Sequence, residues 1–158
     1  MSRAHAQRSF RQPPAAVFAR YTDHASWTEW AGFGRVTLAR AGTDVPNGVG
    51  AVRAFAAAPK LREEVTRFEP PYRMEYRVTA GAFPLADHHG EVVFTPEGTG
   101  TRVRWDVTFR SRVPGLGLPI ARALGVVFGR VLAGLARDLD AHGALRREAR
   151  SRIFPPRS

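Results

Sequence analysis

The sequence predicts an α+β fold: a curved antiparallel sheet of about seven strands wrapped around a long C-terminal helix, with two short helices after the first strand. The stretch TRVRWDVTFR, residues 101–110, alternates apolar and polar side chains, which is typical of a strand with one buried and one solvated face. Further segments bounded by turns precede it from residue 34 onward. The longest helical pattern comes after Pro114, and its apolar side is expected to cover the buried face of the sheet.

The first elements of the chain are short. Residues 4–12 are expected to form the first strand, because Pro13 and Pro14 end it and suit the first turn of a helix over AAVFARY. A second short helix, HASWTEW, follows. Its residues Trp27 and Trp30 are neighbours on one side of that helix and are expected to be packing residues, the alternative being that one of them lies at the mouth of a cavity.

The segments between residues 34 and 110 are separated by Gly, Pro and Asn residues that favour turns. Because the links are short, the pattern predicts an antiparallel meander of six consecutive strands. Their expected ranges are 34–42, 49–57, 61–69, 72–80, 87–95 and 101–110.

In the C-terminal helix, apolar residues including Phe128 and Val131 share one side, and Arg122 and Arg130 lie on the other. Gly143 is expected to end this helix. About 24 residues would then span ~36 Å, which is enough to cross the sheet. The predicted domain therefore covers residues 1–142, and residues 143–158 are predicted to be a basic C-terminal tail.

The composition excludes several classes of function. The chain of 158 residues has the size of one domain, and 44% hydrophobic with 24% charged residues is typical of a globular protein. It has no Cys, so disulfides and thiolate chemistry are excluded. Neither a signal peptide nor a transmembrane segment is predicted, because Arg122 and Arg130 interrupt the most apolar region, 113–136. We therefore expect a cytoplasmic protein.

The net charge of +10 comes almost entirely from arginine, and five arginines lie in the last sixteen residues. Such a charge attracts nucleic acid or an anionic membrane. A nucleic-acid partner is nevertheless not favoured, because no aromatic residues are interleaved with the basic ones as in binding motifs for nucleic acid. Interaction with RNA, the ribosome or an anionic membrane is kept as a further hypothesis, and homodimer formation is left open.

The order of the elements is the helix-grip arrangement, and the sequence resembles the polyketide cyclase/dehydrase and lipid transport family of the SRPBCC (START-like) superfamily. The resemblance is carried by PPAAVFARYTDHASWTEW, by GVGAVR, by EEVTRFEPPYRMEYRV, and by GTRVRWDVTF followed by PGLGLP and the long helix. It covers about residues 5–142 and implies a ligand cavity between the curved sheet and the last helix. The superfamily holds lipid carriers, hormone receptors, cyclases and chaperone-like modules on one scaffold, so the resemblance is specific for fold rather than for function.

The residues expected to line this cavity face the helix from the strands or lie on the apolar side of the helix. The inward direction of Arg53 and Phe55 follows the family resemblance more than the local pattern, and Phe68 has the opposite parity to Glu63 on its strand. The predicted ligand-binding residues are Arg53, Phe55, Glu63, Met74, Tyr76, Val78, His88, Trp105, Val107, Phe128 and Val131.

Two predicted hairpins bring polar residues of this set together. The first places Arg53 opposite Glu63, and a hairpin centred on Ala82 places Tyr76 opposite His88. A guanidinium opposite a buried carboxylate lowers the cost of burying it. These four residues are the candidate catalytic groups. The alternatives are that Arg53 and Glu63 form a structural or solvent-facing ion pair and that Tyr76 is a core residue.

The register of the strand over 87–95 is left open. A regular turn at PEGTG would pair Val93 with Val103 and turn His88 outward, whereas a bulge would let His88 face inward. The sequence DHHG is not expected to bind a metal, because the adjacent side chains of His88 and His89 point to opposite faces of a strand.

Two functions remain for the cavity. The first is the binding of a small hydrophobic ligand, lipid-like or polyketide-like, which needs an apolar pocket with one or two polar anchors. The alternative is a polyketide cyclase or dehydratase, in which His88 or Glu63 is the base while Arg53 and Tyr76 polarise a carbonyl. No cofactor is predicted, since nucleotide-binding motifs are missing. The hairpin tips AAAPK and GAFPLAD are candidates for gating the cavity.

Overall fold

The fold class is as predicted. The computed structural model describes the backbone of residues 1–153 and the side chains of residues 1–146. The chain forms one curved antiparallel sheet. Two short helices and a 3-10 turn follow the first strand, and a long helix ends the described part of the chain. The elements in chain order are β1 (Ser2–Phe10), α1 (Pro14–Thr22), the 3-10 helix η1 (His24–Ser26), α2 (Trp27–Trp30), β2 (Val36–Arg40), β3 (Val52–Phe55), β4 (Ala58–Glu69), β5 (Arg73–Ala80), β6 (Leu85–Glu97), β7 (Gly100–Ser111) and α3 (Gly117–Ile153).

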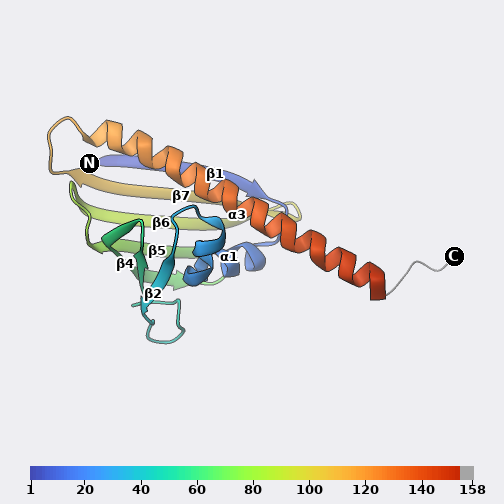
Figure 1. The fold of residues 1–158 in the computed structure, drawn as a ribbon. Coiled ribbons are helices and arrows are strands. Elements are labelled where there is room, and N and C mark those ends of the chain that lie inside the picture. Colours follow the sequence, from blue (N-terminus) through green and yellow to red (C-terminus); the bar gives the residue numbers. More distant parts are fainter. Residues whose placement is uncertain (154–158) are drawn as a thin grey trace.

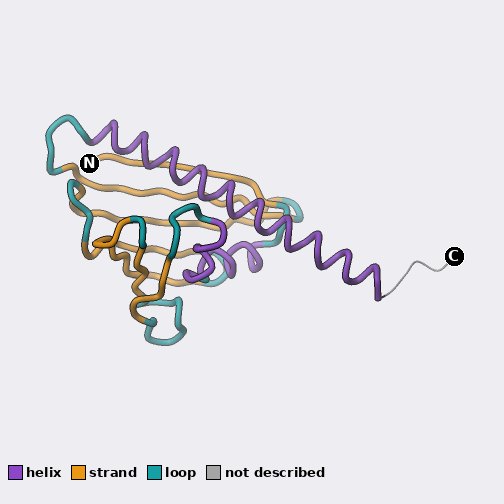
Figure 2. Tube along the Cα trace, viewed as in Figure 1, coloured by secondary structure: helices purple, strands orange, loops and turns teal. Residues whose placement is uncertain are grey.

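The seven strands follow the order β1-β7-β6-β5-β4-β3-β2 across the sheet. The meander from β2 to β7 is therefore continuous, and β1 pairs antiparallel with the last strand at one edge. Figure 1 shows α3 running diagonally across the part of the sheet that contains β1 and β7. The purple helices of Figure 2 lie together on one face of the sheet, so that face is the buried one.

The end of the long helix corrects one prediction. Gly143 does not end α3, which continues to Ile153. Gly143 lacks the positive φ of a C-terminal cap. A glycine inside a helix costs only about 1 kcal/mol relative to alanine, and the residues on either side, Ala, Leu, Arg and Glu, favour helix. Residues 143–153 of the predicted basic tail therefore extend the helix, which projects beyond the sheet in Figure 1. Residues 154–158 lie outside the described part.

Irregularities in two strands decide which side chains face inward. A register shift between Val65 and Arg67 of β4 lets both Val65 and Phe68 face the helices, although their positions differ in parity. A second shift, between Ala86 and His89, interrupts the pairing of β6 with β7.

The solid core lies beneath α1. The ring of Phe18 packs against Phe68 and Phe94, with 5.2 Å between ring centroids in each pair. Tyr21 continues this cluster to Phe94 and to Trp105 of β7, at 5.5 and 5.6 Å. Aromatic rings from one helix and three strands thus fill this half of the space under the helices.

Candidate functional site

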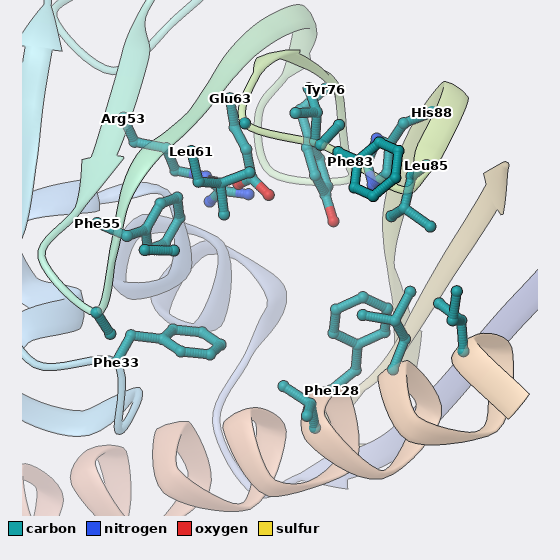
Figure 3. A pocket seen from close by; sticks show the side chains of 18 of the residues that line it. Phe33, Arg53, Phe55, Leu61, Glu63, Tyr76, Phe83, Leu85, His88 and Phe128 are labelled. Carbon is teal, nitrogen blue, oxygen red and sulfur yellow. Dashed lines mark hydrogen bonds and ion pairs between the residues drawn. The ribbon is translucent and has the colours of Figure 1, made fainter. Parts of the chain in front are cut away.

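A cavity of about 340 Å³ lies between the sheet and the first half of α3. Its walls come from β3 to β7, from the turns at 57–58 and 81–84, and from α3, and Figure 3 shows their side chains converging on it. Eight of the eleven residues predicted to bind ligand line this cavity. They are Arg53, Phe55, Glu63, Tyr76, Val78, His88, Trp105 and Phe128.

Three of the predicted ligand-binding residues do not line the cavity. Met74 is fully buried and pairs with Phe68 and Val92, in the solid half of the core beneath α1. Val107 and Val131 are also buried in the continuous core, where β7 and α3 meet the rest of the sheet. Their inward direction was predicted correctly, but the cavity does not extend to them.

Arg53 is the central polar residue of the cavity. Its register partner is Glu63, as predicted, and its Nε donates a hydrogen bond to Glu63 Oε2 at 2.5 Å. The side chain is only 1% exposed, and the guanidinium carbon lies 4.5 Å from the ring centre of Trp27 and 4.7 Å from that of Tyr76. Burial opposes the charged form, but the charge of Glu63 outweighs this effect and raises the pKa of Arg53. Arg53 therefore stays a cation held between two aromatic faces.

The terminal nitrogens of Arg53, Nη1 and Nη2, are buried and have no hydrogen-bond partner. A guanidinium carries five N–H donors, of which the Nε donor alone is satisfied here. Figure 3 shows the guanidinium beside the Glu63 carboxylate at the wall of the cavity. Four N–H donors of Arg53 are therefore buried without a hydrogen-bond partner beside the cavity, next to the polar groups of Glu63, Tyr76 and His88.

Tyr76 presents its hydroxyl to the same space. The indole Nε1 of Trp105 donates a hydrogen bond to Tyr76 Oη at 2.9 Å, so the phenolic proton of Tyr76 is available for a second group. Burial raises the pKa of Tyr76 well above its ordinary value, which keeps this proton on the oxygen. In Figure 3 the hydroxyl points toward the α3 side of the cavity.

The predicted pairing of Tyr76 with His88 is wrong. Tyr76 pairs with Gly90, because the turn between β5 and β6 spans residues 81–84 and its centre lies near Phe83 rather than Ala82. His88 nevertheless faces the cavity, with its ring centre 5.5 Å from that of Tyr76. Burial lowers the pKa of His88, and its Nδ1 has no hydrogen-bond partner. The imidazole is therefore neutral near pH 7 and able to accept a proton.

The open question about the register of β6 is settled by its pairing with β7. Phe94, rather than Val93, lies opposite Val103, so His88 and Phe94 share the buried face. His89 is exposed on the other face. Within residues 1–146, no three His, Asp or Glu side chains lie close enough together to hold a metal ion.

Comparison with known families identifies the same family that the sequence resembles. Residues 1–140 match the family model described as polyketide cyclase/dehydrase and lipid transport. The chain belongs to this family. The match covers the sheet, the cavity and the part of α3 that packs on them. No curated protein matches the sequence significantly.

Solved structures share the helix-grip fold of this family member. XoxI from Bacillus cereus has a TM-score of 0.72 at 17% identity, over 90% of this chain and 99% of its own. A protein from Thermobifida fusca has a TM-score of 0.70 at 22% identity, over 86% and 91%. DynU16, from the dynemicin biosynthetic locus, gives 0.66 at 20% identity, over 89% of this chain and 48% of its own. At these identities the likeness concerns the fold alone.

The sequence patterns do not identify every residue in and around the cavity. Trp27 is expected mainly to pack, with a place at the cavity mouth as the alternative; it lines the cavity, and its ring faces the guanidinium of Arg53. His24, three residues earlier in the chain, does not line the cavity. It is fully buried with both ring nitrogens unpartnered, and burial, followed by the charge of Arg53, lowers its pKa to about 3. Phe33 lies in a loop without periodicity, so no alternation could reveal that it lines the cavity.

Proposed function

We propose that this protein binds a small hydrophobic molecule in the cavity and holds it through an oxygen acceptor placed on the terminal nitrogens of Arg53. The observation that carries the proposal is the pair of buried, unpartnered Nη atoms of Arg53 at the cavity wall. A lipid-like or polyketide-like ligand fits this description. A cytoplasmic location and a homodimer stay predictions.

The energetics favour a ligand with an acceptor. A buried donor without a partner costs about 1–3 kcal/mol, and a guanidinium has more to lose than a neutral group. A carboxylate, or two neighbouring carbonyl oxygens, matches the fork of Nη1 and Nη2. The aromatic and aliphatic walls bury the remainder of the molecule, and a volume of about 340 Å³ suits a small ligand.

A matched pair of fluorescent probes tests this proposal. Anilinonaphthalene sulfonate and phenylnaphthylamine share the same ring system, but only the first carries an anionic acceptor. We expect the wild-type protein to prefer the sulfonate by about ten- to hundred-fold in Kd, because hydrogen bonds to charged groups contribute about 1.5–3 kcal/mol. The double variant Arg53→Met/Glu63→Gln should lose this preference while still binding phenylnaphthylamine.

The control is Arg77→Met/Glu64→Gln, which removes an exposed ion pair of the same type from β5 and β4, 3.0 Å between nitrogen and oxygen. It should keep the wild-type preference. Equal affinity of the wild-type protein for the two probes would contradict the proposal. Native mass spectrometry of protein purified from its own host should also detect a co-purifying hydrophobic compound.

Acid–base catalysis is the second candidate function, favoured by the neutral imidazole of His88 beside Tyr76. In a polyketide cyclase or dehydratase, His88 would take a proton from a carbon next to a carbonyl, while Arg53 and Tyr76 donate hydrogen bonds to the enolate oxygen. Such a reaction needs His88 unprotonated, which its lowered pKa provides near pH 7.

Comparing turnover with uptake distinguishes a catalyst from a carrier. With a flexible poly-carbonyl substrate, His88→Ala and Arg53→Ala should abolish turnover, and His88→Ala should leave uptake of phenylnaphthylamine unchanged. A general base typically contributes about 10²–10⁴-fold to the rate. Turnover that survives both substitutions, or an equal loss of turnover and uptake in the His88 variant, would point to a carrier.

A further inference from the structure

The outer surface of α3 and the segment before it form an unusual region. Residues 107–137 contain five arginines and no Asp or Glu. Within α3, an 18-residue window has a mean hydropathy of 1.6, which is apolar enough by composition for a membrane span, yet only 33% of that window is buried. Part of the remainder, Ile120, Leu124 and Val127, lines the cavity, whereas Leu118 and Val126 face outward.

The outward side of α3 carries apolar and cationic residues at helical spacing. Leu118 and Val126 are 59% and 56% exposed, and Arg122 and Arg130 are exposed as well. The four residues follow one another at intervals of four, so they form one stripe along the helix. Leu118, Arg122 and Val126 also line a shallow groove together beside β1.

A second exposed apolar group lies at the cavity itself. Phe83, in the turn between β5 and β6, lines the cavity and is 80% exposed. The backbone N–H of Arg112 donates to the carbonyl of Pro84 at 2.8 Å, which joins this turn to the segment that leads into α3. Leu116 in that segment is 41% exposed. Exposed apolar residues therefore occur on both neighbouring segments at the rim and continue onto α3.

The unpaired arginines of this surface indicate which kind of partner it binds. Among the side chains of residues 1–146, none of the carboxylates pairs with Arg112, Arg122 or Arg130. A second copy of the chain packed by a twofold axis would bring these arginines near their own equivalents, which repel one another. A nucleic acid would match the charge but leave Phe83 and Val126 uncovered.

An anionic lipid bilayer satisfies both features. Its headgroups attract the guanidinium groups, and apolar side chains enter the boundary with the acyl chains while the arginines remain at headgroup level. We propose that the surface formed by Phe83, Arg112, Leu118, Arg122, Val126 and Arg130 docks on an anionic lipid bilayer. The rim of the cavity then lies at the membrane, and a hydrophobic ligand enters without crossing water.

Sedimentation with lipid vesicles tests the docking. The full chain should bind vesicles of equal parts phosphatidylcholine and phosphatidylglycerol, bind phosphatidylcholine alone only weakly, and lose binding as salt is raised. Arg122→Gln/Arg130→Gln should weaken binding about ten- to thirty-fold, since each arginine near such a surface contributes about 1 kcal/mol. Phe83→Ser/Val126→Ser should weaken binding at unchanged charge.

The matched control removes two positive charges from the opposite face of the sheet. Arg77→Gln/Arg102→Gln should change vesicle binding by less than about threefold if the effect is local rather than one of net charge. An equal loss in this control would overturn the proposal. Tight RNA binding that is unchanged in Phe83→Ser/Val126→Ser would also overturn it. The same holds for a dimer, seen in sedimentation equilibrium, that Phe83→Ser/Val126→Ser dissociates.

The docking does not rest on the proposed ligand contact. Arg53→Met/Glu63→Gln changes the interior of the cavity and should bind vesicles like the wild-type protein. Failure of vesicle binding with an intact preference for the sulfonate probe would refute the docking alone. Vesicle binding without that preference would refute the ligand anchor alone.

Discussion

The two halves of the space between the sheet and the helices are filled differently. Under α1, the rings of Phe18 and Phe94 pack with 5.2 Å between their centres, and Met74 is fully buried. Under the first half of α3, the same strands β4, β5 and β6 border a cavity of about 340 Å³. Two residues further along β5, Tyr76 already lines that cavity. The curved sheet alone therefore does not create the cavity, and the covering side chains decide where it lies.

Small residues keep the hollow half from closing. The turns beside the cavity contribute Ala57, Ala58, Gly81 and Ala82, which cannot reach across it. Gly90 has a different role, because a Cβ at this position would lie 2.3 Å from ring atoms of Tyr76. The missing side chain lets the Tyr76 ring lie over β6 with its hydroxyl against Trp105. In the solid half, large aromatic residues occupy the equivalent space.

Removing a ring from each half tests this difference and should give the largest effect. Phe94→Ala removes a ring that contacts Phe18 and Tyr21 and is 1% exposed, so we expect a loss of about 3–5 kcal/mol in the free energy of unfolding. Phe33→Ala, in the cavity wall, should cost about 1 kcal/mol, because this half-buried ring already borders empty space. Urea unfolding measures both. Equal losses would show that the cavity is closed in solution.

The solid half and the sheet were easier to predict than the cavity. Alternation with period two identified the buried face of β5 and β7. A hairpin assumed to pivot about Ala58 placed Arg53 opposite Glu63, and that pair is correct, but the turn lies at residues 56–57 and a register shift between Ala54 and Phe55 produces it. The same counting failed for Tyr76 and His88, because the length of the turn at 81–84 could not be derived from its residues. Local patterns fix the face of a strand, whereas register depends on the geometry of turns and bulges.

Contacts between elements distant in the sequence were beyond such patterns. Nothing in HASWTEW indicates that Trp27 faces Arg53 or that His24 is sealed beside it, since both facts depend on how η1 and α2 lie on the sheet. The end of α3 was missed for a different reason. Gly143 is a weak stop signal, and the helix formers on both sides of it outweigh its cost.

The buried histidine behind the cavity makes stability depend on pH, with a smaller effect than the loss of Phe94. The pKa of His24 is lowered from its ordinary value near 6.5 to about 3, by burial and by the charge of Arg53. Below pH 6.5 His24 is protonated in the unfolded chain but stays neutral in the folded protein, so the free energy of unfolding falls as the pH falls. By pH 5 the loss should be about 2 kcal/mol relative to pH 7.5. His88, whose pKa is also lowered, acts in the same direction.

Urea unfolding at pH 7.5 and pH 5 measures this dependence, a range in which the carboxylates with lowered pKa, Asp106 and Glu97, stay ionised. His24→Leu should remove most of the loss between the two pH values, and His88→Leu should remove a smaller part. If His24→Leu and the wild-type protein lose equal stability on acidification, His24 is not sealed from solvent in the folded protein.

Adding a ring to each half sharpens the comparison and should give the smallest change in stability. Val78 lines the cavity, so the ring of Val78→Phe enters empty space and should change the free energy of unfolding by no more than about 1 kcal/mol, in either direction. Val92 is fully buried beside Met74, and Val92→Phe should cost about 1–3 kcal/mol through overpacking. The variant at Val78 should also exclude phenylnaphthylamine, whereas the variant at Val92 should bind it normally while folded. A Val78→Phe protein that keeps full affinity for the probe would mean that hydrophobic molecules bind elsewhere on this chain, because a ring at position 78 occupies the volume that the ligand needs.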